Sequence, residues 1–220
     1  MSLLEVKDLS FAYKNGVQII ERINFTLNKG DCLAIKGPNG SGKTTLAKLL
    51  TRILRPTGGH ILLEGKDISE LTLADIGKKI GYVMQNPERQ VFSHTVEEDI
   101  AFSLRHRGFK SEEVEKKIDK MLDFFELNRY RKTSPFILSR GEQQRLAIAS
   151  VLVLEPEILL LDEPTTGLDP LRKKKLELML RDLYYNGTTL IVISHDHKFL
   201  SKLFNKELCI ENGLMREDML

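Results

Sequence analysis

Cysteine is scarce in this sequence: Cys32 and Cys209 are the only two among 220 residues. Both lie in apolar, strand-like runs, so we expect buried free thiols in a reducing compartment rather than a disulfide framework. An excess of one charge is also missing, because 33 Lys and Arg residues face 31 Asp and Glu residues. This balance gives no indication of nucleic-acid binding. Together with a hydrophobic content of 41%, it excludes a disordered chain.

Long apolar runs are absent as well. The strongly apolar stretches, such as residues 158–161, extend over only a few residues, whereas a helix that spans a bilayer needs about 20. Near the N-terminus, Glu5, Lys7 and Asp8 interrupt the apolar sequence, so we expect no signal peptide. By elimination, these features predict a cytosolic globular protein with one large domain, or a core domain that carries a smaller subdomain.

Short apolar runs alternate with turn residues over most of the chain. Asn15-Gly16 is a favoured hairpin turn, and apolar residues recur at helical spacing from Leu46 to Leu54 before Pro56. A second helix is expected through Leu176 and Leu183. The expected strands lie at residues 3–13, 17–27, 32–36, 60–64, 80–84, 158–161 and 189–193, of which the last two are apolar enough to be buried on both faces.

The segment from residue 86 to residue 135 is charged and has helical periodicity. Ser111 and two glutamates precede a helical apolar stripe that consists of Val114, Ile118, Met121, Leu122 and Phe125. We therefore expect a single α/β domain over residues 1–220. Residues 1–85 and 136–220 form its core, which begins with an antiparallel β subdomain, and residues 86–135 form a helical insert.

A glycine-rich loop follows the expected strand at residues 32–36. It satisfies the phosphate-binding pattern G-x-x-x-x-G-K-[ST] and consists of Gly37, Pro38, Asn39, Gly40, Ser41, Gly42, Lys43 and Thr44. Glycine lets the backbone N–H groups curl around a triphosphate, and the following helix adds its positive N-terminal end. Lys43 is expected to contact the β- and γ-phosphates, and the Thr44 hydroxyl to bind Mg²⁺. We call residues 37–44 the phosphate loop.

Two adjacent carboxylates end the apolar run at residues 158–161. On a parallel sheet, the C-terminal ends of the strands line the ligand crevice, so Asp162 and Glu163 are expected to face the phosphates. Asp162 would bind Mg²⁺, directly or through water. Glu163 would act as the general base toward the attacking water.

Residues 138–142, Leu-Ser-Arg-Gly-Glu, open a helix in which Ser139 and Glu142 form a capping box. We call them the signature segment. Along the chain, the phosphate loop, Gln85, this segment, the two acids, Asp169 and His195 follow one another in a fixed order. This order resembles that of the nucleotide-binding subunit of an ATP-binding cassette (ABC) transporter, from Tyr13 to His195. The resemblance implies a P-loop NTPase (RecA-like) fold and an ATPase that uses ATP and Mg²⁺.

The resemblance also implies roles for single residues. Tyr13 stacks on adenine, and Gln85 links Mg²⁺ and the attacking water to the transporter interface. Asp169 signals across a dimer, and His195 contacts the γ-phosphate. The site residues expected are Glu163, His195 and Gln85 for catalysis; Tyr13, residues 37–44, Thr45, Ser139, Gly141 and Asp169 for the nucleotide; and Thr44, Gln85 and Asp162 for the metal.

In this family two subunits pair head to tail, and the signature segment of one closes the phosphate loop of the other. Ser139 and the Gly141 N–H would then cap a γ-phosphate bound by a second ATPase subunit, identical or different. The sequence departs from the family pattern LSGGQ, because Arg140 replaces a glycine and Glu142 replaces the glutamine. We expect the Arg140 side chain to turn outward or towards phosphate, and the resulting site to be slower than the partner's.

The residues after Gln85 indicate a branch of the family. The stretch Asn86-Pro87-x-x-Gln90-x-Phe92 resembles the ATPases of energy-coupling-factor importers, which carry vitamins, cobalt or nickel. There the insert docks a membrane coupling protein, so residues 90–102 are expected to form a docking groove on the cytoplasmic face of the cell membrane. Three alternatives remain: the ATPase of another ABC transporter branch, a soluble ABC protein of translation or DNA repair, and a P-loop kinase. Two cassettes or a long coiled coil would favour the soluble class, and phosphate transfer to an added acceptor would favour the kinase.

Overall fold

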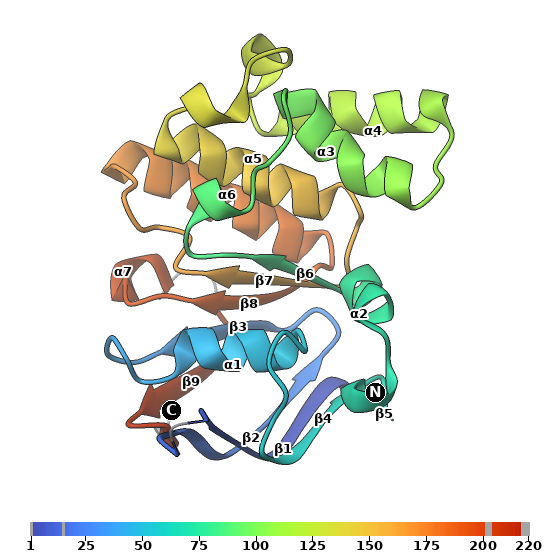
Figure 1. Cartoon of the computed structure of the whole chain (residues 1–220). Coiled ribbons are helices and arrows are strands. Elements are labelled where there is room, and N and C mark those ends of the chain that lie inside the picture. Colours follow the sequence, from blue (N-terminus) through green and yellow to red (C-terminus); the bar gives the residue numbers. More distant parts are fainter. Residues whose placement is uncertain (1, 15, 201–203, 217–220) are drawn as a thin grey trace.

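The computed structural model describes residues 2–14, 16–200 and 204–216, and its elements build two sheets flanked by helices (Figure 1). Asn15, half of the predicted hairpin turn, lies outside the described residues. The strands are β1 Ser2–Ala12, β2 Gln18–Asn28, β3 Cys32–Lys36, β4 Gly58–Leu63, β5 Lys66–Asp67, β6 Ile80–Val83, β7 Ile158–Asp162, β8 Thr189–Ile193, β9 Lys206–Glu211 and β10 Leu214–Arg216. The α-helices are α1 Lys43–Leu50, α2 Leu73–Lys79, α3 Val96–His106, α4 Ser111–Phe124, α5 Arg140–Leu152, α6 Pro170–Tyr185 and α7 His197–Leu200.

The larger sheet has the strand order β10-β9-β3-β8-β7-β6. All neighbouring strands in it are parallel except β10, which pairs antiparallel with β9. Strands β7 and β8 are buried at every position, as their continuous apolar sequence predicts. The α/β fold class expected from the sequence is therefore confirmed.

Alternating side chains along the strands of this sheet belong to two separate hydrophobic cores, one on each face of the sheet. Leu159 and Leu161 of β7 face the core shared with helices α3 to α6, whereas Ile158 and Leu160 face the core shared with α1 and the smaller sheet. Both sets are fully buried. This alternation follows from the two-residue period of a strand, and it fixes the register of the sheet between two apolar layers.

The smaller sheet is antiparallel, with the strand order β2-β1-β4-β5. Helix α1 runs between the two sheets (Figure 1), and its buried residues Leu46, Leu49 and Leu50 belong to the core between them. The antiparallel N-terminal part expected from the sequence is present, and it packs against the helix that follows the phosphate loop.

Helices α3 and α4 lie within residues 86–135 and cover α5 on the opposite side of the larger sheet (Figure 1). A capping box formed by Thr95 and Glu98 starts α3. The stripe of α4 that begins at Val114 is buried as predicted. The division into core and insert stays a prediction. Among the described residues, no helix has the length and apolar character that crossing a bilayer requires.

Two local expectations need correction. Helix α1 ends at Leu50 rather than continuing to Leu54, because Arg52 adopts a left-handed φ of 56° that a helix cannot contain. Cys209 is half-buried rather than buried, whereas Cys32 is buried as expected, and neither forms a disulfide within the described part of the chain. Helix α4 begins at Ser111, where the sequence indicates a helix start, and Lys110 occupies its N-cap without a side-chain hydrogen bond.

Candidate functional site

The phosphate loop lies between β3 and α1 and depends on glycine at two positions. Gly37 has a φ of 143°, and a Cβ there would lie 2.0 Å from the Ile210 carbonyl oxygen of β9. Gly42 has a φ of 104°, and its Cβ would lie 2.8 Å from the Ile20 side chain. Gly42 is also the N-cap of α1 and supplies no capping side chain. The first N–H groups of α1 are thus available to an anion.

Lys43 lies folded into the phosphate loop. Its ammonium donates hydrogen bonds of 2.9 Å to the carbonyl oxygens of Gly37 and Pro38. The residue is only 6% exposed, so the charge stays close to the loop backbone. An ammonium held in this way is ready to exchange two carbonyl partners for phosphate oxygens.

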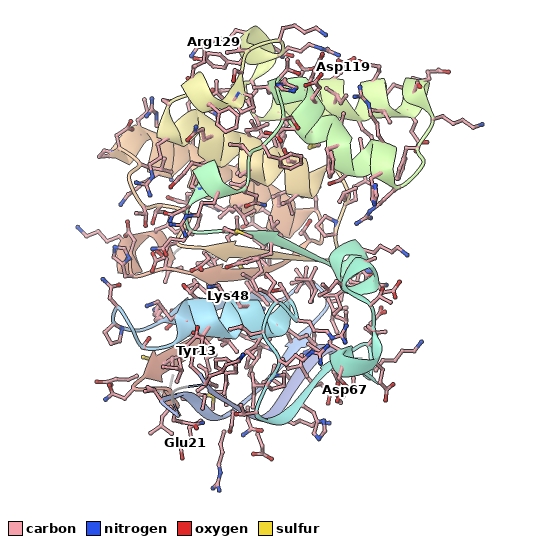
Figure 2. All side chains as sticks on the ribbon, in the orientation of Figure 1. Tyr13, Glu21, Lys48, Asp67, Asp119 and Arg129 are labelled. Carbon is pink, nitrogen blue, oxygen red and sulfur yellow. The ribbon has the colours of Figure 1, made fainter. Side chains whose placement is uncertain are left out.

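One cavity brings together most of the predicted nucleotide-binding residues. It has a volume of about 320 Å³. Figure 2 shows Tyr13 beside α1, the helix that begins at Lys43. Tyr13 itself is 42% exposed and packs edge-on against Phe11 at 4.9 Å. The lining residues are Tyr13, Ile19, Asn39, Gly40, Gly42, Lys43, Thr44, Thr45, Gln85 and Glu163.

The two acids at the end of β7 differ in their surroundings. Asp162 is 1% exposed, and burial raises the pKa of its carboxyl although Thr44, Tyr82 and Lys43 act in the opposite direction. Its Oδ2 accepts a hydrogen bond of 3.3 Å from the Tyr82 hydroxyl. Its Oδ1 is buried and has no hydrogen-bond partner among the described residues. A buried carboxylate oxygen of this kind suits a cation.

Glu163 holds a strained position at the rim of the same cavity. Its φ is 50°, in the left-handed region that residues other than glycine rarely adopt, and its N–H donates to the Ile193 carbonyl at 2.8 Å. The side chain is buried, and its Oε2 lies 2.8 Å from the Nδ1 of His195. The ends of β7 and β8 thus bring a carboxylate and an imidazole into contact, and strained residues of this kind cluster at functional sites.

The signature segment and Asp169 lie outside this cavity, and the signature segment contacts Gly167 and Arg172 on either side of Asp169. The Arg140 side chain lies across Gly167, where a Cβ would meet it at 3.0 Å, and the Arg172 side chain lies across Gly141 in the same way. The Asp169 carboxylate caps α6 by accepting from the Arg172 N–H at 2.9 Å. Arg140 is exposed, as expected, but it rests on the neighbouring loop.

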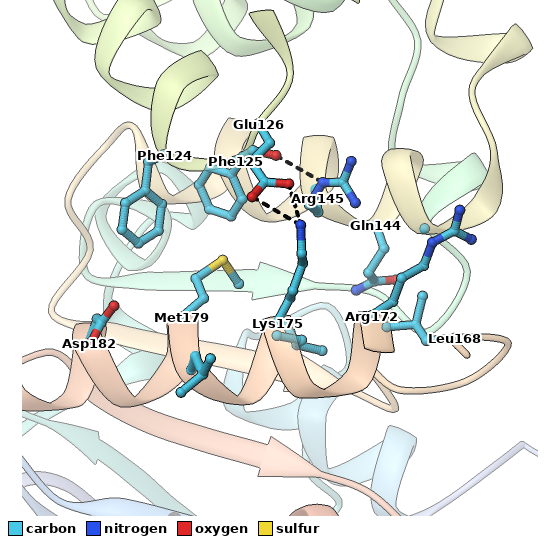
Figure 3. A pocket seen from close by; sticks show the side chains of 13 residues that line it. Phe124, Phe125, Glu126, Gln144, Arg145, Leu168, Arg172, Lys175, Met179 and Asp182 are labelled. Carbon is cyan, nitrogen blue, oxygen red and sulfur yellow. Dashed lines mark hydrogen bonds and ion pairs between the residues drawn. The ribbon is translucent and has the colours of Figure 1, made fainter. Parts of the chain in front are cut away.

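A smaller cavity of about 200 Å³ lies next to the signature segment, between the end of α4 and helices α5 and α6. Figure 3 shows its aromatic wall, formed by Phe124 and Phe125, and Lys175 reaching from α6 towards Glu126. The ion pair between Lys175 and Glu126 measures 2.7 Å. This cavity shares Gly141 with the signature segment but contains no residue of the phosphate loop.

Glu142, which replaces the family's glutamine, is held by several donors. Its Oε2 accepts from the Ser139 N–H at 2.8 Å and from the Ser139 hydroxyl at 2.7 Å, which closes the predicted capping box. Its Oε1 accepts from the Tyr130 hydroxyl. Burial alone would raise the pKa of Glu142, but the hydrogen bonds from Tyr130 and Ser139 lower it from 4.5 to about 2.

The lowered pKa of Glu142 predicts a pH-dependent contribution to stability. Because the carboxylate is favoured in the folded state, its contribution is complete above pH 4.5 and is lost as the pH falls towards 2. Glu142→Gln should therefore flatten the fall of the melting temperature between pH 5 and about pH 3. Thermal melts of both proteins measure this, with Glu112→Gln on exposed α4 as the control. Identical pH profiles for the wild type and Glu142→Gln would contradict the assignment.

Sequence reasoning missed several contacts around the cavity. Ile19 lines it, the Tyr82 hydroxyl contacts Asp162, and the Gln90 side chain bonds to the backbone on both sides of residue 83. Tyr82 and Gln90 both lie in segments that carried a motif, but a motif does not say which backbone group a side chain meets.

Comparison with known proteins agrees with this geometry. Residues 20–166 match the family model described as ABC transporter. The energy-coupling factor transporter ATP-binding protein EcfA of Methanocaldococcus jannaschii is 41% identical over 198 residues, which cover 89% of this chain and 71% of that protein. The chain spans only 37% and 34% of the length of two other relatives, ABC transporter ATP-binding proteins from Caldanaerobacter subterraneus and Methanosarcina acetivorans.

Two solved structures share the fold closely. CbiO1 from Clostridium perfringens, part of the ABC transporter complex CbiONQ, has a TM-score of 0.89 at 32% identity and matches 98% of this chain and 87% of its own. The dimeric post-hydrolysis structure of the ATP-binding cassette MJ0796, bound to ADP and Pi, has a TM-score of 0.88 at 28% identity. It matches 97% of this chain and 96% of its own length.

Proposed function

Because the chain belongs to the ABC transporter family and is an ATPase, we propose that it is the motor subunit of an energy-coupling-factor importer. The cavity that joins Tyr13, the phosphate loop, Gln85 and Glu163 is the observation that carries the ATPase assignment. The branch rests on the sequence after Gln85 and on the similarity to EcfA and CbiO1. In this proposal the cargo is a vitamin or a cobalt or nickel ion, and the subunit works at the cytoplasmic face of the membrane.

Each residue of the cavity has a task in ATP hydrolysis. Tyr13 stacks on the adenine, and Lys43 neutralises the terminal phosphates. Glu163 accepts a proton from the attacking water while His195 holds the carboxylate and contacts the γ-phosphate. Mg²⁺, where bound, would neutralise charge on the phosphates. Thr44, Gln85 and Asp162 would hold it, and the unpartnered Oδ1 of Asp162 supports this assignment.

A second ATPase subunit would complete the site. Ser139, Gly141 and Asp169 are absent from the lining of the nucleotide cavity of their own chain, and all three lie at the starts of helices α5 and α6. Free N–H groups at a helix start can cap a phosphate that another molecule presents. The dimeric structure of the MJ0796 cassette supports the pairing of two such subunits.

An exposed aromatic pair supports docking to a membrane protein. Phe92 and Phe102 are 57% and 50% exposed, and their rings pack edge-on at 4.7 Å. His106 stacks parallel to Phe102, and Phe102, His106 and Ser93 border an open hollow of about 390 Å³, beside which the Phe92 ring packs on Phe102. We call this surface the aromatic groove. Exposed aromatic residues at the surface of a protein are typical anchors of an interface.

The docking test uses the transmembrane coupling subunit of an energy-coupling-factor transporter, co-expressed with this chain and purified in detergent. Phe102→Glu should weaken the association about tenfold or more, because truncating an interface anchor costs at least about 2 kcal/mol. Basal ATP hydrolysis should not change. Tyr185→Glu, which alters an aromatic residue 71% exposed at the end of α6, is the matched control. A wild-type chain that hydrolyses ATP but does not associate with the coupling subunit would assign it to another branch of the family.

A further inference from the structure

The side chain of Gln90 makes two hydrogen bonds to the backbone of the segment that leads to Gln85. Its Oε1 accepts from the Met84 N–H at 3.0 Å, and its Nε2 donates to the Tyr82 carbonyl at 3.0 Å. Both groups that the Gln90 amide contacts belong to the main chain, so these two hydrogen bonds fix the orientation of the amide. Gln90 therefore joins the end of β6 to the far side of the loop that contains Gln85.

The intervening loop is short and has its own hydrogen bonds. A 3₁₀ turn covers Pro87–Arg89, and the Gln90 N–H donates to the Pro87 carbonyl at 2.9 Å. The Arg89 N–H donates to the Asn86 carbonyl at 3.1 Å. Gln85 lines the nucleotide cavity, and its side chain has no hydrogen bond or ion pair within the described part of the chain. The β7 ladder pairs Val83 with Leu161, and the bonds from Gln90 extend this support past the end of β6 to Met84, the residue before Gln85.

We propose that Gln90 is a positioning residue that acts through Gln85. By closing residues 84–90 into a ring, its amide fixes the direction in which the Gln85 side chain enters the nucleotide cavity. The inference rests on the role of Gln85 given under the proposed function. It adds a residue that touches neither nucleotide nor metal, and through the Tyr82 carbonyl it also holds the strand whose Tyr82 hydroxyl contacts Asp162.

The same segment ends at the aromatic groove. Val91 is 5% exposed and packs in the helical core. The next two N–H groups, of Phe92 and Ser93, both donate to Oδ1 of Asp99 on α3 at 3.3 Å. Asp99 is 4% exposed. One buried residue thus separates the Gln90 amide from the ring of Phe92, so a protein docked on that ring would act on the segment that Gln90 holds.

The first test replaces Gln90 by methionine, which keeps the length of the side chain and removes both hydrogen bonds. We expect kcat for ATP hydrolysis by the purified chain to fall about tenfold. The two neutral hydrogen bonds that position Gln85 are lost, and together they are worth enough free energy to account for a change of this size in rate. KM for ATP and the affinity for ATP should not change, since Tyr13 and the phosphate loop are untouched. Arg89→Met, an exposed neighbouring residue, is the matched control and should leave kcat unchanged.

The second test asks whether the effect passes through Gln85. In a Gln85→Ala background, adding Gln90→Met should produce no further loss of kcat, because the group that Gln90 positions is already gone. Gln90→Glu keeps the acceptor for the Met84 N–H but sets an oxygen against the Tyr82 carbonyl, so its kcat should lie between those of Gln90→Met and the wild type.

Three outcomes would overturn the assignment. They are an unchanged kcat in Gln90→Met, an equal loss in the wild-type and Gln85→Ala backgrounds, and a rise in KM as large as the fall in kcat. The last two would assign Gln90 a general structural role. A wild-type chain without ATPase activity would contradict the proposed function itself, which separates that failure from a failure of the positioning role.

Discussion

The Glu163→Gln protein should bind ATP but hydrolyse it at least about 100-fold more slowly than the wild type. An amide has nearly the shape of the carboxylate but cannot accept the proton of the attacking water. The side chain is 6% exposed, and its backbone has a φ of 50° at the end of β7, so we expect the glutamine to occupy the same place. Phosphate release under steady-state conditions measures the loss.

The same protein reports on assembly. ATP that cannot be hydrolysed stays bound, so size exclusion with light scattering should detect a dimer only with ATP and Mg²⁺. Glu112→Gln, at an exposed ion pair of α4, is the control and should behave as the wild type does. A monomer that retains bound nucleotide would indicate a different ATPase subunit as the obligatory partner. Hydrolysis at the wild-type rate would contradict the assignment of Glu163 as general base.

The second large effect is expected from Lys43→Met. The ammonium supplies the positive charge inside the phosphate loop and now holds the carbonyl groups of Gly37 and Pro38. Removing a donor that stabilises charge in a reaction of this kind costs about two to three orders of magnitude in kcat. Each lost hydrogen bond to a charged group also weakens ATP binding by about 1.5–3 kcal/mol.

Fluorescent ATP-analogue titration and phosphate release measure the two losses separately. Lys48→Met is the matched control, because Lys48 lies in the last turn of the same helix (Figure 2) and does not line the nucleotide cavity. That change should leave both quantities within about twofold of the wild type, since a cation in the last turn contributes about 0.3–1 kcal/mol to the helix alone. Normal ATP binding and hydrolysis in Lys43→Met would contradict the role given to the phosphate loop.

The parts of the fold that the sequence predicts are those in which local pattern and tertiary structure coincide. Residues 158–161 and 190–193 are apolar throughout and lie in strands buried at every position. The phosphate loop needs glycine at fixed positions, and Ser139 with Glu142 closes a capping box within four residues. Each of these features depends on groups close together in the chain.

The features that sequence reasoning missed depend on groups that tertiary structure brings together. The end of α1 is set by the left-handed conformation of Arg52, whose guanidinium donates to the Ser69 carbonyl at 3.0 Å. The sequence shows that Arg140 departs from the family pattern, but the position of its side chain across Gly167 depends on how two segments of the chain pack. The Gln90 bonds likewise require the end of β6 and the start of the insert to lie side by side.

The contact between β9 and the phosphate loop has a consequence for how the protein is made. A Cβ on Gly37 would lie 2.0 Å from the Ile210 carbonyl oxygen, and a Cβ on Gly213, which follows β9, would lie 2.5 Å from the Ile19 carbonyl oxygen beside the nucleotide cavity. The Gly213 carbonyl also accepts from the Glu21 N–H at 2.8 Å. A ribosome-bound chain that has not yet released residues 206–213 therefore lacks the rear support of its nucleotide site, so ATP can bind firmly only after these residues have left the ribosome.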